Sequence, residues 1–247
     1  MTKKPSASRI AVSLEVGSKL TFASALDWPG WCRSGRDASA AVAALRAYAP
    51  RHAPVVRDAG LTPPDPDAIE VVEHLPGSGT TDFGAPGAIS PVERERCTPA
   101  EAARLASLLD ACWRHLDRVA AGAPAALRKG PRGGGRDRDA IVDHVLSAER
   151  DAYARKIGLR LPAPDRGDPS SIATQRAAIK AVILSAAGPR SASPPPPAPD
   201  SVLPRRSASA ERPERGWPVR YAVRRIAWHV LDHAWEIEDR SAPAPPA

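Results

Sequence analysis

Two histidines near the end of the chain, His229 and His233, are spaced to bind one metal ion. They lie in a segment, residues 218–240, whose apolar residues recur at helical spacing. Residues i and i+4 of a helix share one face, with Cβ atoms about 6 Å apart, so both imidazoles can reach the same ion. A third histidine, His144, lies in a second helical pattern. Three neutral nitrogen ligands with open coordination positions are typical of a catalytic rather than a structural metal site.

The predicted last helix places further polar residues on the same line as its histidines. On a helical wheel Glu236 and Arg225 lie within about 40° of His229, and apolar residues border this line on both sides. Polar groups enclosed in this way need partners, and a metal ion would satisfy two imidazoles at once. The alternative is that the histidines are hydrogen-bonded core residues. On the second helix, small residues beside His144 leave room for an ion or a substrate: Ala148 and Ala152.

Carboxylates near the histidines are candidates to orient them or to act as a general base. They are Glu236, Asp232 and Asp151. Each would otherwise be a solvated residue on a helix surface, and for Asp232 we favour that alternative. The ligand type leaves the metal open, because zinc, nickel, iron and manganese all accept imidazole.

A stretch rich in glycine and arginine, residues 127–137, precedes the helix of His144. It lacks the GK[ST] ending of a P-loop. A glycine-rich backbone, several arginines and a helix N-terminus nevertheless form a natural anion site. We interpret Arg132 or Arg136 as holding a carboxylate or phosphate of a small-molecule substrate. The alternative is a basic linker.

The patterns along the chain predict an α+β protein in two modules. Alternating apolar residues predict strands over 9–16, 19–27 and 69–75, and Asp37 is a cap for a helix over 38–58. We therefore expect a small ββαβ module over 9–76 and a linker over 77–97.

Helical periodicity dominates after the linker. Thr98, Pro99 and Glu101 form a strong helix start, and later helices are expected over 137–157, 170–187 and 218–240. These elements predict an all-α four-helix bundle over 98–240 with a proline-rich insert at 188–216, followed by a disordered tail at 241–247.

Composition narrows the class of protein. The net charge is +7, but only six of the 35 basic residues are lysine and the arginines are interleaved with acidic residues. Nucleic-acid binding by the arginine-rich loops is therefore only a third hypothesis. Three cysteines without CxxC spacing indicate a reducing compartment rather than a disulfide scaffold. Since no signal-peptide core and no run of about 18 apolar residues occurs, we expect a cytoplasmic protein without a membrane partner.

The helical part, residues 98–240, resembles the DinB-like superfamily of metal-binding four-helix bundles. The resemblance is carried by the pattern Tyr221-x-x-Arg224-Arg225 before the HxxxH pair, and by Ala148-Glu149-Arg150 after the third histidine. It implies that one histidine on the second helix joins the pair on the last helix to bind a divalent metal; here these are His144, His229 and His233. The family includes thiol-dependent transferases and isomerases, among them mycothiol-dependent maleylpyruvate isomerase, which implies a low-molecular-weight thiol as cofactor.

The N-terminal residues 20–45 resemble the HicB-like fold, in which a strand leads into a Pro-Gly turn and then a helix. The matching residues are Asp27, Pro29, Gly30, Gly35, Asp37 and Ala41. In HicB antitoxins this module occludes a toxin and often precedes a DNA-binding helical segment, which the helices downstream here do not resemble. We therefore expect a unit for packing, homodimerisation or lidding a pocket.

Two hypotheses of function follow. The leading one is a divalent-metal-dependent enzyme that performs thiol-dependent transfer or hydrolysis on a small molecule. The alternative is a non-enzymatic binding or regulatory protein with a structural metal or no metal, in which the N-terminal module contacts a partner. They differ in whether the metal keeps an exchangeable water in an accessible pocket.

Overall fold

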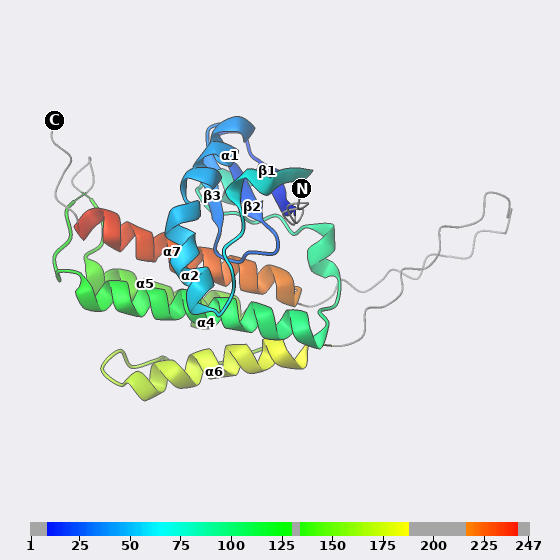
Figure 1. The fold of residues 1–247 in the computed structure, drawn as a ribbon. Coiled ribbons are helices and arrows are strands. Elements are labelled where there is room, and N and C mark those ends of the chain that lie inside the picture. Colours follow the sequence, from blue (N-terminus) through cyan, green and yellow to red (C-terminus); the bar gives the residue numbers. More distant parts are fainter. Residues whose placement is uncertain (1–8, 130–133, 188–215, 242–247) are drawn as a thin grey trace, which may run out of the picture.

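The computed structural model describes residues 9–129, 134–187 and 216–241. It is a mixed α+β protein with a four-stranded sheet near the N-terminus and long helices after it (Figure 1). The sheet order is β3-β2-β1-β4, in which β1 pairs antiparallel with β2 and parallel with β4. The strands are β1 (Ile10–Val16), β2 (Thr21–Ala25), β3 (Cys32–Gly35) and β4 (Ile69–Pro76).

The predicted ββαβ order is wrong in its number of strands, because the structure contains a further strand, β3, between β2 and the first helix. Its four residues include the polar Arg33 and Ser34 and show no apolar alternation. Antiparallel pairing with β2 at the edge of the sheet holds β3 in place. Such long-range pairing leaves no periodic signal in a stretch this short.

Two helices replace the single helix predicted over 38–58. Helix α1 spans Ala38–Ala47 and begins at the predicted cap, where the Asp37 carboxylate accepts a hydrogen bond from a backbone N–H at 2.8 Å. Helix α2 spans Ala49–Asp58. Pro50 lacks the N–H that would continue α1, and its ring would clash with the carbonyl four residues earlier, so the chain begins a new helix.

The segment predicted as a linker, residues 77–97, contains two short helical elements. They are α3 (Gly79–Asp82) and the 3₁₀ helix η2 (Pro91–Arg94). Each begins at a serine that takes part in a capping box, Ser78 and Ser90 respectively. Local capping therefore orders a stretch that lacks hydrophobic periodicity.

Four longer helices follow, close to the predicted positions. Helix α4 begins after Thr98, whose backbone N–H donates to the Glu101 carboxylate at 2.8 Å, as the capping pattern predicts. The helix predicted over 137–157 is α5 followed by a π-helical turn over Glu149–Ala154. The helices are α4 (Pro99–Gly122), α5 (Arg138–Ala148), α6 (Pro169–Ser185) and α7 (Val219–Ser241).

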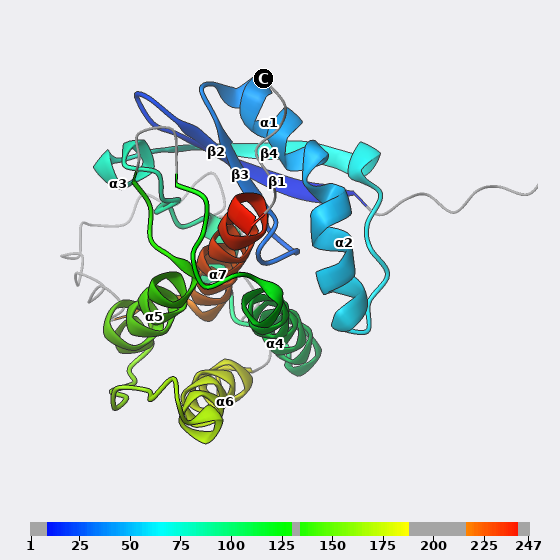
Figure 2. The same cartoon turned by 90° about the vertical axis from the view of Figure 1, so that its left-hand side faces the viewer.

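Helix α7 lies between the sheet and the other long helices (Figure 2). On the sheet side Phe22 of β2 meets Trp228 edge-on, with ring centroids 6.1 Å apart. On the other side α7 packs against α4 and α5. Because both sides are covered, every residue from Tyr221 to Leu231 is buried except Arg225. A helix that is buried nearly all round is a central element of a core.

A buried ion pair ties α7 to the segment that precedes α4. The Arg224 guanidinium donates to both carboxylate oxygens of Glu93, at 2.5 and 2.9 Å, and both side chains are 3 % exposed. It also donates to the Ala88 carbonyl at 2.8 Å and to the Ser24 hydroxyl of β2 at 3.3 Å. One side chain therefore joins α7, the sheet and the connecting segment.

A second buried group lies where α4, α6 and the π-helical turn meet. The Glu149 carboxylate accepts hydrogen bonds from the Trp113 indole N–H at 2.5 Å and from the Gln175 amide at 3.2 Å. Glu149 is fully buried, and this burial raises the pKa of its carboxyl group.

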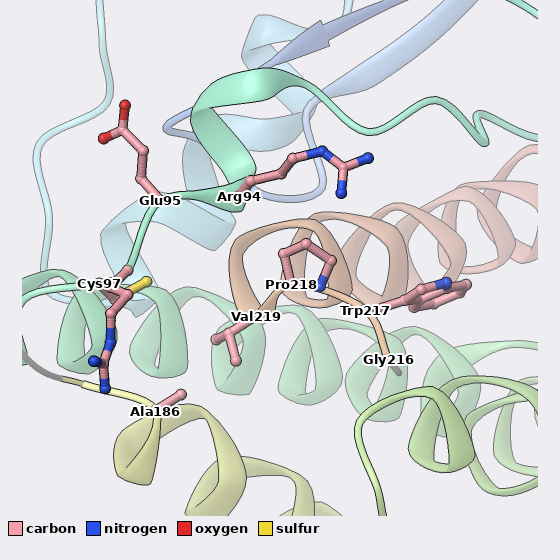
Figure 3. A pocket seen from close by; sticks show the side chains of 9 residues that line it. Arg94, Glu95, Cys97, Ala186, Gly216, Trp217, Pro218 and Val219 are labelled. Carbon is pink, nitrogen blue, oxygen red and sulfur yellow. The ribbon is translucent and has the colours of Figure 1, made fainter. Parts of the chain in front are cut away.

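A cavity of about 390 Å³ lies at the N-terminal end of α7 (Figure 3). Cys97, Ala186 and Trp217 are among the residues that line it, whereas the three predicted ligand histidines are not. Within the described ranges, no helix combines the length and apolar character that crossing a membrane requires.

We predict that Arg224→Met lowers the free energy of unfolding by about 3–5 kcal/mol, because it leaves the Glu93 carboxylate buried without a partner. Urea denaturation measures the change. Adding Glu93→Leu removes the orphaned charge and should recover part of the loss. The control is Arg9→Gln, whose ion pair with Glu70 joins side chains that are 58 % and 55 % exposed and should matter by less than about 1 kcal/mol. If Arg224→Met and Arg9→Gln lowered the free energy of unfolding equally, the structural role assigned to the Arg224–Glu93 pair would be contradicted.

We predict that Glu149→Gln stabilises the protein increasingly as pH rises. Between the ordinary carboxyl pKa of roughly 4.3 and its raised value, folded Glu149 holds a proton that the unfolded chain has released. Wild-type stability therefore falls as pH rises through this window, and the variant lacks that loss. Urea unfolding of both proteins across the window measures the difference. Glu70→Gln, an exposed carboxylate, is the matched control, and a pH-independent difference for Glu149→Gln would refute the prediction.

Candidate metal centre

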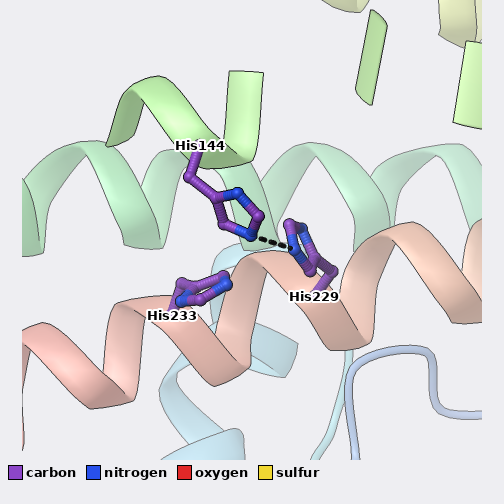
Figure 4. A group of neighbouring side chains, drawn as sticks. All are labelled: His144, His229 and His233. Carbon is purple, nitrogen blue, oxygen red and sulfur yellow. Dashed lines mark hydrogen bonds between the residues drawn. The ribbon is translucent and has the colours of Figure 1, made fainter. Parts of the chain in front are cut away.

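The three predicted histidines meet on facing helices (Figure 4). His144 extends from α5, while His229 and His233 lie one turn apart on α7. One potential ligand atom from each lies within 4.8 Å of the others, and the Nε2 atoms of His144 and His229 are 3.2 Å apart. The ring centroid of His233 is 4.9 Å from that of His144 and 4.6 Å from that of His229. The structure thus brings together residues that are far apart in sequence.

Glu236 fixes the tautomer of one of these histidines. The Nδ1 atom of His233 lies 2.9 Å from the Glu236 carboxylate, to which it must donate because a carboxylate only accepts. The neutral ring then carries its lone pair on Nε2, the nitrogen available to a metal. Glu236 is in turn held by Arg240, at 2.7 Å. The predicted carboxylate is therefore an orienting residue for a ligand histidine.

The surroundings lower the pKa of two of the imidazoles, His144 and His229. Burial lowers the pKa of His229 to about 2, and the neighbouring imidazoles act in the same direction. Burial also lowers the pKa of His144. The hydrogen bond from His233 is the main cause that holds the pKa of Glu236 below its usual value. Neutral imidazoles beside an ionised carboxylate are the protonation states that metal binding requires.

The side chains present fit a divalent metal ion. The 3.2 Å between two Nε2 atoms is close to the roughly 3.3 Å expected for two nitrogens held tetrahedrally at about 2.0–2.1 Å from one zinc ion. The Nδ1 atom of His229 is buried without a hydrogen-bond partner among the described residues. A metal ion bound at Nε2 would leave this Nδ1–H unchanged, so the fit to an ion depends on the Nε2 atoms. Their 3.2 Å separation suits a shared ion and is also the length of a hydrogen bond between the two rings (Figure 4).

Two arginines place positive charge near the histidines. Arg136, predicted as an anion-binding residue, is exposed before α5, and its charge contributes to lowering the pKa of both His144 and His229. Arg225 contributes to the lowered pKa of His229 in the same way. The other predicted anion-binding residue, Arg132, lies outside the described residues.

The remaining predicted carboxylates lie away from the histidines. Asp232 pairs with Arg33 of β3 at 2.9 Å, across the junction with the sheet. Asp151 pairs with Arg150 at 2.6 Å on the surface of the π-helical turn. Neither makes a hydrogen bond to a histidine of the cluster, so the structure gives neither residue the orienting role considered for it.

Aromatic residues that carried no sequence signal surround the cluster. The Tyr153 ring stands nearly perpendicular to that of His229, with centroids 5.4 Å apart, and the Trp228 ring lies 6.1 Å away. Arg225 precedes His229 by four residues and lies on the same line of the helix, as its position in the sequence predicts. Tyr153 follows His144 by nine residues, a spacing that predicts no shared face on an α-helix.

A cavity of about 360 Å³ lies along the C-terminal half of α7, and the three histidines are not among the residues that line it. Its lining includes Glu236, which holds His233, together with Arg33, Tyr48 and Trp235. The Arg33 guanidinium lies 4.0 Å from the centroid of the Tyr48 ring. Residues of the N-terminal module and of α7 therefore form one concave surface next to the orienting carboxylate.

Comparisons of this chain with protein-family models, with curated proteins and with solved structures found no match.

We predict that Glu236→Gln weakens metal binding by about 10–100-fold, because the neutral amide is a poorer partner for the His233 Nδ1–H. Competition with a chromophoric chelator measures the affinity. The control is Glu238→Gln, which removes an equal charge from the same helix. Glu238 contacts Arg51 and His115 rather than the cluster, so this variant should bind metal with the affinity of the wild type. The orienting role of Glu236 would be disproved if both variants bound metal as the wild type does.

Proposed function

We propose that this protein is a divalent-metal-dependent enzyme whose metal is held by His144, His229 and His233. The observation that carries the proposal is the convergence of three imidazole nitrogens, from two helices, to within 4.8 Å of one another. Three neutral ligands leave coordination positions for water or substrate, which is the arrangement of catalytic rather than structural sites. The hydrogen bond from His233 to Glu236 adds the outer contact typical of such centres.

We further propose that α4, α5, α6 and α7 form a DinB-like four-helix bundle, preceded by a HicB-like module over 9–76. The position of one ligand on the second of these helices and two on the last supports this assignment. The contacts of α7 with α4 and α5, and of α4 with α6, also support it. The resemblance favours thiol-dependent transfer or hydrolysis as the reaction class, with a low-molecular-weight thiol as a candidate cofactor.

The chain's own residues would prepare the site for this chemistry. A bound divalent ion would supply a positive charge that acidifies a water or a thiol into a nucleophile at neutral pH. The imidazoles add no negative charge that would weaken this effect. Glu236 keeps the His233 ring oriented, and the buried position of His229 limits the access of bulk water. Zinc, nickel, iron and manganese all remain compatible with the ligands.

We expect about one divalent metal ion per chain in protein purified without chelator or histidine tag, and loss of that metal in His229→Ala. Elemental analysis measures the content, and far-UV circular dichroism checks the fold of the variant. His74→Ala is the control, because His74 is an exposed residue of β4. It should retain the metal.

The metal content of the wild type and of His229→Ala decides between the two hypotheses of function. Metal that depends on His229 justifies screening thiol-transfer and hydrolase substrates with the metal-loaded protein. A wild-type protein that stays free of metal after reconstitution would overturn the enzyme proposal.

A further inference from the structure

Arg225 lies one helical turn before His229, and no carboxylate of the described residues pairs with it. The other arginines of α7 each pair with a carboxylate: Arg220 with Glu101, Arg224 with Glu93 and Arg240 with Glu236. Arg225 forms no ion pair within the described part of the chain, and its Nη1 atom is buried without a hydrogen-bond partner. A guanidinium nitrogen that is removed from water in this way needs a hydrogen-bond acceptor, and an anionic acceptor matches its charge.

Aromatic packing holds this guanidinium in place. Its central carbon lies 4.4 Å from the ring centroid of Trp228 and 5.4 Å from that of Tyr153. The same two rings also contact His229. Arg225 and a ligand histidine therefore share one aromatic surround, and the planar face of the guanidinium is used for stacking. The N–H groups at its edge remain available for a bidentate contact.

The charges around the cluster favour an anionic ligand. Arg225 and Arg136 both act on His229, and a bound divalent ion would add two further positive charges. The carboxylate nearest the histidines, Glu236, is already shared between His233 and Arg240. The centre as a whole thus has more positive than negative charge.

We propose that Arg225 binds the negatively charged oxygen group, a carboxylate or a phosphate, of a small organic substrate that reacts at the three-histidine centre. This inference rests on the proposed function and adds the substrate class. Tyr153 and Trp228 supply apolar contact for the part of the substrate next to the charged group. Arg225 is partly exposed whereas its neighbours along α7 are buried, so a ligand can reach it from solvent.

The test is calorimetric titration of the zinc-loaded protein with three probes: benzoate, inorganic phosphate and the neutral benzyl alcohol. We expect one or both anions to bind the wild type, and Arg225→Gln to weaken that binding by about tenfold or more while retaining the metal. Arg225→Lys keeps the charge but loses the planar fork of the guanidinium, so its anion affinity should lie between those of the wild type and Arg225→Gln. Arg36→Gln removes the same charge from a side chain that is 90 % exposed and serves as the matched control.

Each outcome bears on a distinct claim. Selective loss of benzoate binding assigns a carboxylate, and selective loss of phosphate binding assigns a phosphate. Equal anion affinity in the wild type and Arg225→Gln, or no binding of either anion by metal-loaded wild type, overturns the inference and leaves the proposed function intact. Failure of the wild type to bind zinc, nickel, iron and manganese alike overturns the proposed function itself. If Arg225→Gln does not fold, Arg225→Lys carries the comparison.

Discussion

The burial of α7 is the constraint on which the rest of the structure depends. The sheet covers one side of this helix and α4 with α5 cover the other, so its sequence must suit several neighbours at once. Trp228 packs against Phe22 of the sheet, whereas His229, the next residue, lies beside His144 of α5. A helix in this position cannot rotate without breaking contacts on both sides. The orientation of His229 and His233 is therefore set by the hydrophobic core.

Each polar group inside such a core needs its own hydrogen-bond or ion-pair partner, as the charged residues of α7 illustrate. Arg224 is buried with Glu93 and receives further acceptors from the sheet and the connecting segment. Pairs of this kind add less to stability than to the choice of one packing arrangement over others, because a shifted helix would leave both charges unpaired. The histidine cluster and Arg225 differ from this pattern, since part of their bonding capacity is unused among the described residues. Polar groups that lack a partner within the protein are common at functional sites.

The sequence predicted the elements whose signals are local and periodic. The long helices, the caps at Asp37 and Thr98 and the HxxxH pair follow from short-range spacing, and the structure places them near the predicted positions. Strand β3 was missed because pairing with β2, rather than its own pattern, makes it a strand. The predicted helix over 38–58 is divided because Pro50 interrupts the backbone hydrogen bonds, although apolar residues continue on both sides of it. The meeting of His144 with the pair on α7 was predicted from three residues, whereas the isolation of Arg225 depends on where the carboxylates of distant segments lie.

The π-helical turn after α5 has a geometric consequence for the wall of the site. In an uninterrupted α-helix, the nine steps from His144 to Tyr153 would correspond to about 900° of rotation, so the two side chains would point in opposite directions. A π-helical turn accommodates one extra residue and reduces this rotation by about 100°. Both rings consequently contact His229, at 5.1 and 5.4 Å between centroids. A single π-helical turn thus leaves the His144 and Tyr153 side chains about 80° apart rather than about 180°, so that both rings can face α7.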